Sequence, residues 1–158
     1  MKKFKTNILY LLIVFNSILQ SFCIIIDILN DSKSIINITN ILNEHEDEKK
    51  IELHFIESYY NFRNLNEINL PISQNQIISF SGINETILDY GKANRTSFNI
   101  FFRKDSPSYS NANVIFKNFL FTNRIARNFT DKSGAINIFV NKNNRINIDI
   151  ENCRFEGM

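Results

Sequence analysis

The feature that most constrains this chain is an alternation of apolar and polar residues that recurs along its length. In "RINIDIEN" (145–152), three isoleucines share one strand face, and Asn, Asp and Glu share the other. Strand side chains alternate between two faces, so this pattern predicts a strand with one buried face. Four other segments show it: "QIISFSG" (76–82), "TSFNIFFR" (96–103), "NVIFKN" (113–118) and "GAINIFVN" (134–141). No segment after residue 60 keeps a helical period, which predicts an all-β chain of short strands.

The predicted strands also repeat in register. "VIFKNFLFTN" (114–123) aligns with "IDIENCRFEG" (148–157), which places Asn118 on Asn152. "ISFSG" (78–82) aligns with "VIFKN", and Phe98 aligns with Ile136, at a nearly constant spacing along the chain. Such a repeat, with two matched strands per unit, predicts parallel stacking of equivalent strands about 4.8 Å apart. Asn118 and Asn152 are then candidates for an amide ladder at the strand–turn corner.

Three segments, 77–90, 113–123 and 146–158, resemble the coils of right-handed parallel β-helix proteins of the pectate-lyase-like superfamily. They are most similar to its secreted, Asn- and Ile-rich members of unassigned activity. The resemblance implies a right-handed parallel β-helix, or solenoid, of about three coils over residues 51–158, after an N-terminal segment and polar loop at 24–50. In that family further coils follow such segments. The resemblance therefore implies an incomplete β-helix, either the N-terminal part of a longer protein or a truncated gene product.

The N-terminus has the organisation of a secretory signal peptide. A basic stretch, "MKKFKTN", precedes the apolar "ILYLLIVF", and the small residues Ser21 and Cys23 stand where cleavage after residue 23 requires them. An uncleaved signal anchor is the alternative, although polar residues between 16 and 21 interrupt the apolar run. We therefore expect a secreted or surface-exposed protein with no stable membrane span after cleavage.

Cleavage would also change the charge of the chain. It would remove three lysines, at positions 2, 3 and 5, and no acid, which takes the formal net charge from +2 to −1. The basic character thus belongs to the targeting segment, and no nucleic-acid partner is expected.

Asparagine and isoleucine are the two most abundant residue types, as an A+T-rich coding sequence would produce without functional cause. Five N-x-[ST] sequons are candidate N-glycosylation sites, compatible with a secreted glycoprotein. They begin at Asn30, Asn37, Asn84, Asn94 and Asn128. The two cysteines are Cys23 and Cys153; once Cys23 is removed, Cys153 is expected to act as a small buried apolar residue.

The sequence predicts no catalytic residue, no metal site and no cofactor, since it has no P-loop, G-x-G-x-x-G, CxxC or HExxH segment. Asp149 and Glu151 share an outward strand face, but we interpret them as solvated surface residues. His45 lies in the charged loop "NEHEDEKK", where consecutive residues converge poorly on one ion. Phe101 and Phe139 are predicted to point outward, where they could stack on sugars, so a carbohydrate or cell-wall polymer is the partner we consider.

Three functional hypotheses follow. The first is a non-enzymatic secreted or cell-surface β-helix with a structural, adhesive or wall-associated role. The second is the N-terminal fragment of a polysaccharide lyase or hydrolase whose catalytic coils lie beyond residue 158. The third is a truncated gene product without independent function.

The signal-peptide prediction can be tested by expressing the whole chain through a secretory pathway. The intact mass of the secreted product should correspond to a chain that begins at Ile24, after removal of any glycans with an endoglycosidase. A product that retains residues 1–23 and stays with the membrane fraction would instead support the signal anchor.

Overall fold

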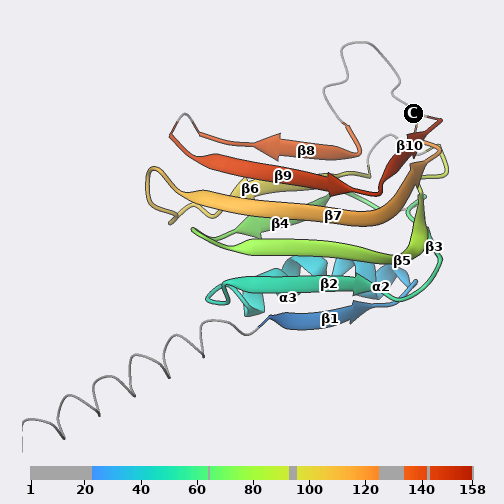
Figure 1. Cartoon of the computed structure of the whole chain (residues 1–158), viewed down its shortest axis with the longest axis horizontal. Helices are drawn as coiled ribbons and strands as arrows, with labels where there is room; N and C mark the ends of the chain where they lie inside the picture. Colours follow the sequence, from blue (N-terminus) through green and yellow to red (C-terminus); the bar gives the residue numbers. More distant parts are fainter. Residues whose placement is uncertain (1–22, 64, 93–95, 125–133, 142, 158) are drawn as a thin grey trace, which may run out of the picture.

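The computed structural model describes residues 23–63, 65–92, 96–124, 134–141 and 143–157. Apart from Cys23, the predicted signal peptide lies outside these residues. The described part consists mainly of parallel β-strands, with two short helices near its start (Figure 1). In chain order the elements are β1 (Ile24–Ile28), α2 (Ser32–Ile36), α3 (Ile38–Glu44), β2 (Lys50–Phe55), β3 (Tyr59–Asn61), β4 (Ile68–Ile72), β5 (Ile77–Asp89), β6 (Phe98–Phe102), β7 (Asn111–Thr122), β8 (Ile136–Phe139), β9 (Arg145–Glu151) and β10 (Arg154–Glu156).

The strands form two sheets. In the seven-stranded sheet, β1, β2, β5 and β7 follow one another, β9 and β10 both pair with β7, and β3 pairs with β5. The three-stranded sheet has the order β4-β6-β8. Every strand pairing in the described part is parallel. The prediction of an all-β chain with parallel strands is therefore confirmed at this level.

The register predicted from the sequence repeat is also confirmed. Ile78 pairs with Val114 in the neighbouring strand, and Val114 pairs in turn with Ile148. These are the partners that the alignment of the repeats gives. In the second sheet, Phe98 pairs with Ile136, again as aligned.

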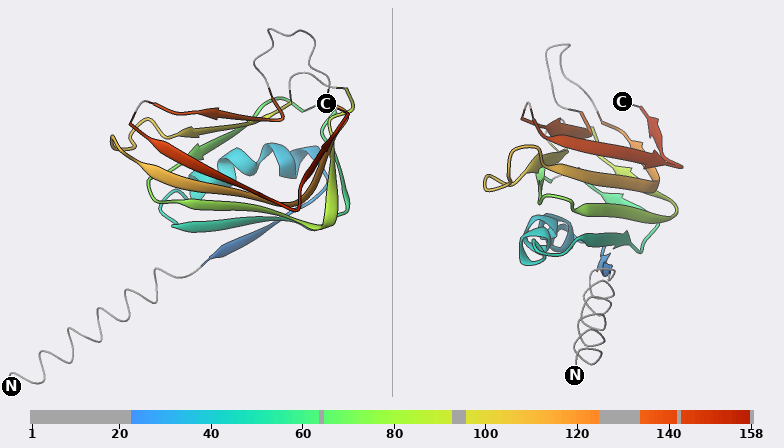
Figure 2. Two further views of the ribbon diagram at one scale, coloured as in Figure 1. Left: turned by 45° about the horizontal axis from the view of Figure 1, so that its top comes forward. Right: turned by 60° about the vertical axis from the view of Figure 1, so that its left-hand side comes forward.

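The N-terminal segment contributes to the same sheet, which the repeat did not reveal. Strand β1 pairs with β2 so that Ile24 lies beside Ile51, at a shorter spacing along the chain than in the repeat. The two helices follow, and Asp31 caps α2 by accepting a hydrogen bond of 2.7 Å from the Ser34 backbone N–H. They lie at the same end of the molecule as β1, and α3 packs on β4 (Figure 2).

An aromatic core fills the space between the two sheets. Phe80 and Phe116, from neighbouring strands, stack with ring centroids 4.8 Å apart and an interplanar angle of 11°. Phe98 of the second sheet contacts both rings, at 5.6 and 5.7 Å. All three side chains are buried. Because parallel strands place equivalent residues beside one another, each ring covers the apolar surface of the next.

The last layer departs from the expected burial. We expected Ile138 and Val140 to share a buried face with Ile136, but both are exposed and Ile136 is half-buried. The reason is that, among the described residues, β8 has a partner strand on one side only. Their apolar surface therefore has no described layer above it.

The stacked core predicts a strong difference between two phenylalanines. Phe116→Ala should lower the free energy of unfolding by about 3–5 kcal/mol, because it leaves a cavity between Phe80 and Phe98. The exposed Phe139→Ala should change it by less than ~0.5 kcal/mol. Urea unfolding followed by circular dichroism measures both, and equal losses would contradict the core described here.

Candidate functional site

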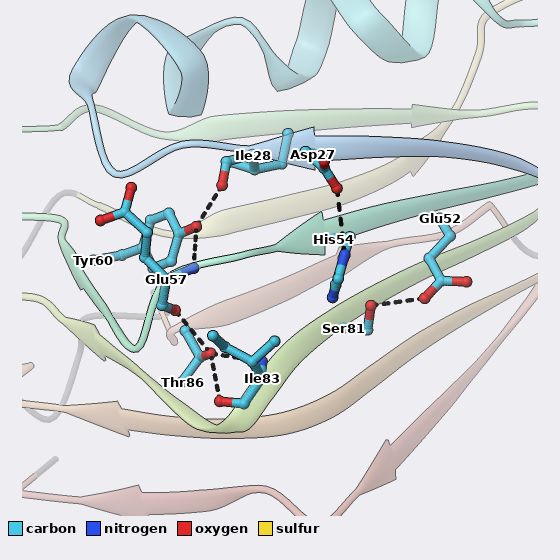
Figure 3. A network of polar contacts seen from close by, with 9 residues as sticks. All are labelled: Asp27, Ile28, Glu52, His54, Glu57, Tyr60, Ser81, Ile83 and Thr86. Atoms are coloured by element: carbon cyan, nitrogen blue, oxygen red, sulfur yellow. Dashed lines mark hydrogen bonds and ion pairs between the residues drawn. The ribbon is translucent and has the colours of Figure 1, made fainter.

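A row of polar residues crosses the outer face of the seven-stranded sheet. Asp27, His54, Ser81, Lys117 and Glu151 are successive register partners on β1, β2, β5, β7 and β9. The His54 Nδ1 atom lies 3.3 Å from Asp27 Oδ1, and Lys117 Nζ lies 3.0 Å from Glu151 Oε2. The first three residues of the row are shown in Figure 3. The opposite charges of Lys117 and Glu151 in neighbouring strands thus stabilise the sheet surface modestly.

The hydroxyl group in this row is held by a carboxylate. Ser81 Oγ donates a hydrogen bond of 2.7 Å to Glu52 Oε1, as Figure 3 shows. A serine nucleophile is activated by donating its proton to a base such as histidine. Here the hydroxyl proton of Ser81 is directed to the Glu52 carboxylate. We therefore interpret the row as a set of hydrogen-bond donors and acceptors on the sheet surface. Within the described ranges, no group of three or more His, Cys, Asp or Glu residues is arranged to hold a metal ion.

The two predicted ladder residues lie together at a sheet corner. Asn152 Nδ2 donates to Asn118 Oδ1 at 3.4 Å, and Asn118 Nδ2 donates to the Gly82 carbonyl at 3.2 Å. Both asparagines are in the left-handed region, with φ of 61° at Asn118 and 51° at Asn152. Asn tolerates this conformation better than most residues. The corner thus joins three successive strands through side-chain amides and one carbonyl.

Glycine is required at the equivalent position of β5. A Cβ atom on Gly82 would lie 2.6 Å from Thr86 Cβ and 2.7 Å from the Asn118 carbonyl oxygen. The register shifts between Ser81 and Thr86, so β5 makes a longer turn here than the strands above it. The close approach of this turn to Asn118 excludes a side chain.

Two further amide pairs were missed by the sequence reasoning. Asn147 Nδ2 donates to Asn113 Oδ1, and Asn137 Nδ2 donates to Asn99 Oδ1, each at 2.9 Å. The signal was present in the repeat, because the members of each pair occupy aligned positions of successive repeats. Amide ladders therefore occur on both sheets, on strand positions as well as at the corner.

Asp89 makes a second polar corner. Its carboxylate accepts hydrogen bonds from Tyr59 Oη (2.9 Å), the Gly91 N–H (2.8 Å) and Asn123 Nδ2 (3.0 Å). Partial burial alone would raise the pKa of Asp89, but the three donors outweigh it and lower the pKa below its ordinary value. Asp89 is thus a structural acceptor held in the charged form.

An aromatic hollow lies on the three-stranded sheet. Phe101 of β6 and Phe139 of β8 are register partners, and Phe139 is 57% exposed. Phe102, Ile138, Val140 and Asn141 complete the described lining. The hollow therefore combines exposed ring and aliphatic surface with an amide side chain at one end. We call these six residues the aromatic hollow.

The three sequon asparagines within the described residues are not gathered into one site. Asn30 is half-buried and its Oδ1 accepts from the Asn61 N–H at 3.2 Å. Asn37 is exposed between the two helices, and Asn84 is exposed in the β5 turn with φ of 46°. Asn94 and Asn128 lie outside the described residues. Exposure at Asn37 and Asn84 leaves room for a glycan.

The other residues considered in the sequence form no common site: His45 lies at the end of α3, far along the chain from Asp149, Glu151 and Cys153, which are neighbours at the end of β9. Asp149 is exposed, whereas the neighbouring Glu151 is bound by Lys117. Cys153 is half-buried against the core, where burial raises the pKa of its thiol, so it is a poor nucleophile at neutral pH.

Comparison of the chain with protein-family models, with curated proteins and with solved structures gave no match. Within the part of the chain that the structure describes, no helix has the length and apolar character needed to cross a bilayer.

The corner geometry predicts different effects for two substitutions of Asn118. Asn118→Gly keeps the left-handed backbone and loses the amide hydrogen bonds, which should cost about 1 kcal/mol of unfolding free energy. Asn118→Ala loses the bonds and also strains the backbone, which should cost about 2 kcal/mol in total. Chemical unfolding curves would show this order, and an alanine variant as stable as the glycine variant would contradict it.

Proposed function

We propose that the chain is a right-handed parallel β-helix that acts outside the cell as a non-enzymatic binding module for a carbohydrate polymer. The parallel pairing of all described strands and the repeated register support the β-helix. The signal-like N-terminus and the exposed sequons at Asn37 and Asn84 support an extracellular location. Its role on this view is adhesive or wall-associated.

The aromatic hollow is the observation that carries this proposal. An exposed apolar surface on a folded protein marks an interaction site when its residues are contiguous. Phe139 presents an accessible ring beside Phe101, and Asn141 adds amide donor and acceptor groups. Sugar rings offer C–H faces that stack on aromatic rings and hydroxyls that pair with amides. A carbohydrate chain matches both properties of the hollow.

The placement of the polar row favours binding over cleavage at this surface. His54 and Asp27 belong to the seven-stranded sheet, whereas Phe101 and Phe139 belong to the three-stranded sheet. A sugar held on the aromatic rings would thus lie on a different sheet from the only histidine–carboxylate pair described. The described lining of the hollow carries no ionisable side chain to act as acid or base.

The proposal predicts that the secreted chain is retarded in native gels that contain a binding polysaccharide, tested with a panel of neutral glucans, chitosan and pectic polymers. Phe139→Ala should weaken retardation roughly tenfold in apparent Kd, because it removes the exposed ring. Tyr59→Ala is the matched control, since Tyr59 is an exposed aromatic residue of the other sheet; because it also removes a hydrogen bond to Asp89, its folding is checked by circular dichroism. If no polymer retards the chain, or if both variants bind like the wild type, the hollow is not a carbohydrate site.

A further inference from the structure

Strand β9 has a free edge in the described structure. Its only described partner is β7, and the Arg145 N–H donates toward β7, to the Ser110 carbonyl, at 2.9 Å. Backbone groups point alternately to the two sides of a strand. The N–H and C=O groups of Ile146, Ile148 and Ile150 therefore point to the free edge. An edge of this kind is a template for pairing with another strand.

The apolar positions next to this edge lack cover. Val114 and Phe116 of β7 are 0% exposed, whereas Ile150, the register partner of Phe116, is 49% exposed. Phe121 is likewise 0% exposed, and its stacked partner Phe155 is 46% exposed. Equivalent inward-facing positions are thus buried in β7 and exposed in β9 and β10. A further layer on β9 and β10 would bury them.

We propose that a second copy of this chain covers this end, through antiparallel pairing of the two β9 strands about a two-fold axis at Ile148. In that register Ile148 faces its own equivalent, and Ile146 faces Ile150. Arg145 of each copy faces Glu151 of the other. The sequence "RINIDIE" is thus complementary to itself in charge and in apolar pattern. A two-fold axis requires such a self-complementary surface.

The hydrogen bonding agrees with this register. Ile146, Ile148 and Ile150 are the residues whose backbone groups point to the free edge, and all three occupy the hydrogen-bonded pairs of the proposed ladder. Arg145 and Glu151 occupy a non-hydrogen-bonded pair, in which facing side chains come closest. Glu151 would then lie between Lys117 of its own chain, at 3.0 Å, and Arg145 of the second copy.

Head-to-tail stacking is disfavoured by charge. Addition of β1 from another copy to β9, along the rows of the sheet, would continue the row that runs from Asp27 to Glu151. It would place Asp27 beside Glu151, and like charges at facing positions repel. Such stacking would also leave open ends and form fibres. The charges therefore select a closed dimer.

Charge reversal tests the proposed register. Sedimentation velocity of the full chain after secretion, across a concentration series, should show a monomer–dimer equilibrium. Arg145→Glu and Glu151→Arg should each raise the dimer Kd roughly tenfold or more, because each creates two symmetric like-charge contacts. The double variant restores opposite charges and should return the Kd to near the wild-type value.

Controls separate this effect from folding and from carbohydrate binding. Lys117→Ala breaks the ion pair to Glu151 within the chain and should leave the dimer intact. Circular dichroism reports whether each variant folds. If a charge-reversal variant fails to fold, the neutral variant at the same position, Arg145→Gln or Glu151→Gln, takes its place. A monomer at all concentrations, fibres, or a Kd unchanged by the single reversals would overturn the proposal. The aromatic hollow is not altered by these variants, so failure of the dimer leaves the carbohydrate test standing.

Discussion

Parallel, in-register stacking of equivalent strands is the constraint on which the rest of this structure depends. It places each side chain about 4.8 Å from its equivalent in the next strand. Apolar positions thereby become columns, as in the stacked rings of Phe80 and Phe116. Amide positions become ladders, as at Asn113 and Asn147. One geometric relation thus generates the core, the outer face and the corners.

A stack of parallel strands has two ends, and in this protein the two ends differ. At one end, α3 packs on β4, and Arg103 donates to the carbonyl of Leu42 near the helix C-terminus. At the other, the last described strands leave Ile150 and Phe155 exposed. The surfaces that we propose for binding and assembly therefore fall on the uncovered layer and on the outer faces. The proposed roles of the aromatic hollow and of the β9 edge both follow from this asymmetry.

Much of the fold could be predicted from the sequence, because strict alternation sets the faces and the spacing of the repeats sets the register. The pairing of β1 with β2 could not, since its spacing is shorter than that of the repeats and the two segments share little beyond isoleucine. The row from Asp27 to Ser81 depends on that pairing and was missed with it. Two of the three donors around Asp89 could not be foreseen either, because Tyr59 lies in β3 and Asn123 follows β7, and only the folded chain brings them to Asp89. The third, the Gly91 N–H, is local, two residues further along the chain.

Backbone nuclear Overhauser effects on the isotopically labelled secreted chain test this stacking most directly. The account predicts contacts between Ile78 and Val114 and between Val114 and Ile148, with the pattern of parallel strands. It predicts no backbone contact between Ile78 and Ile148, which are two strands apart. Contacts that join Ile78 directly to Ile148, or an antiparallel pattern within the chain, would contradict it.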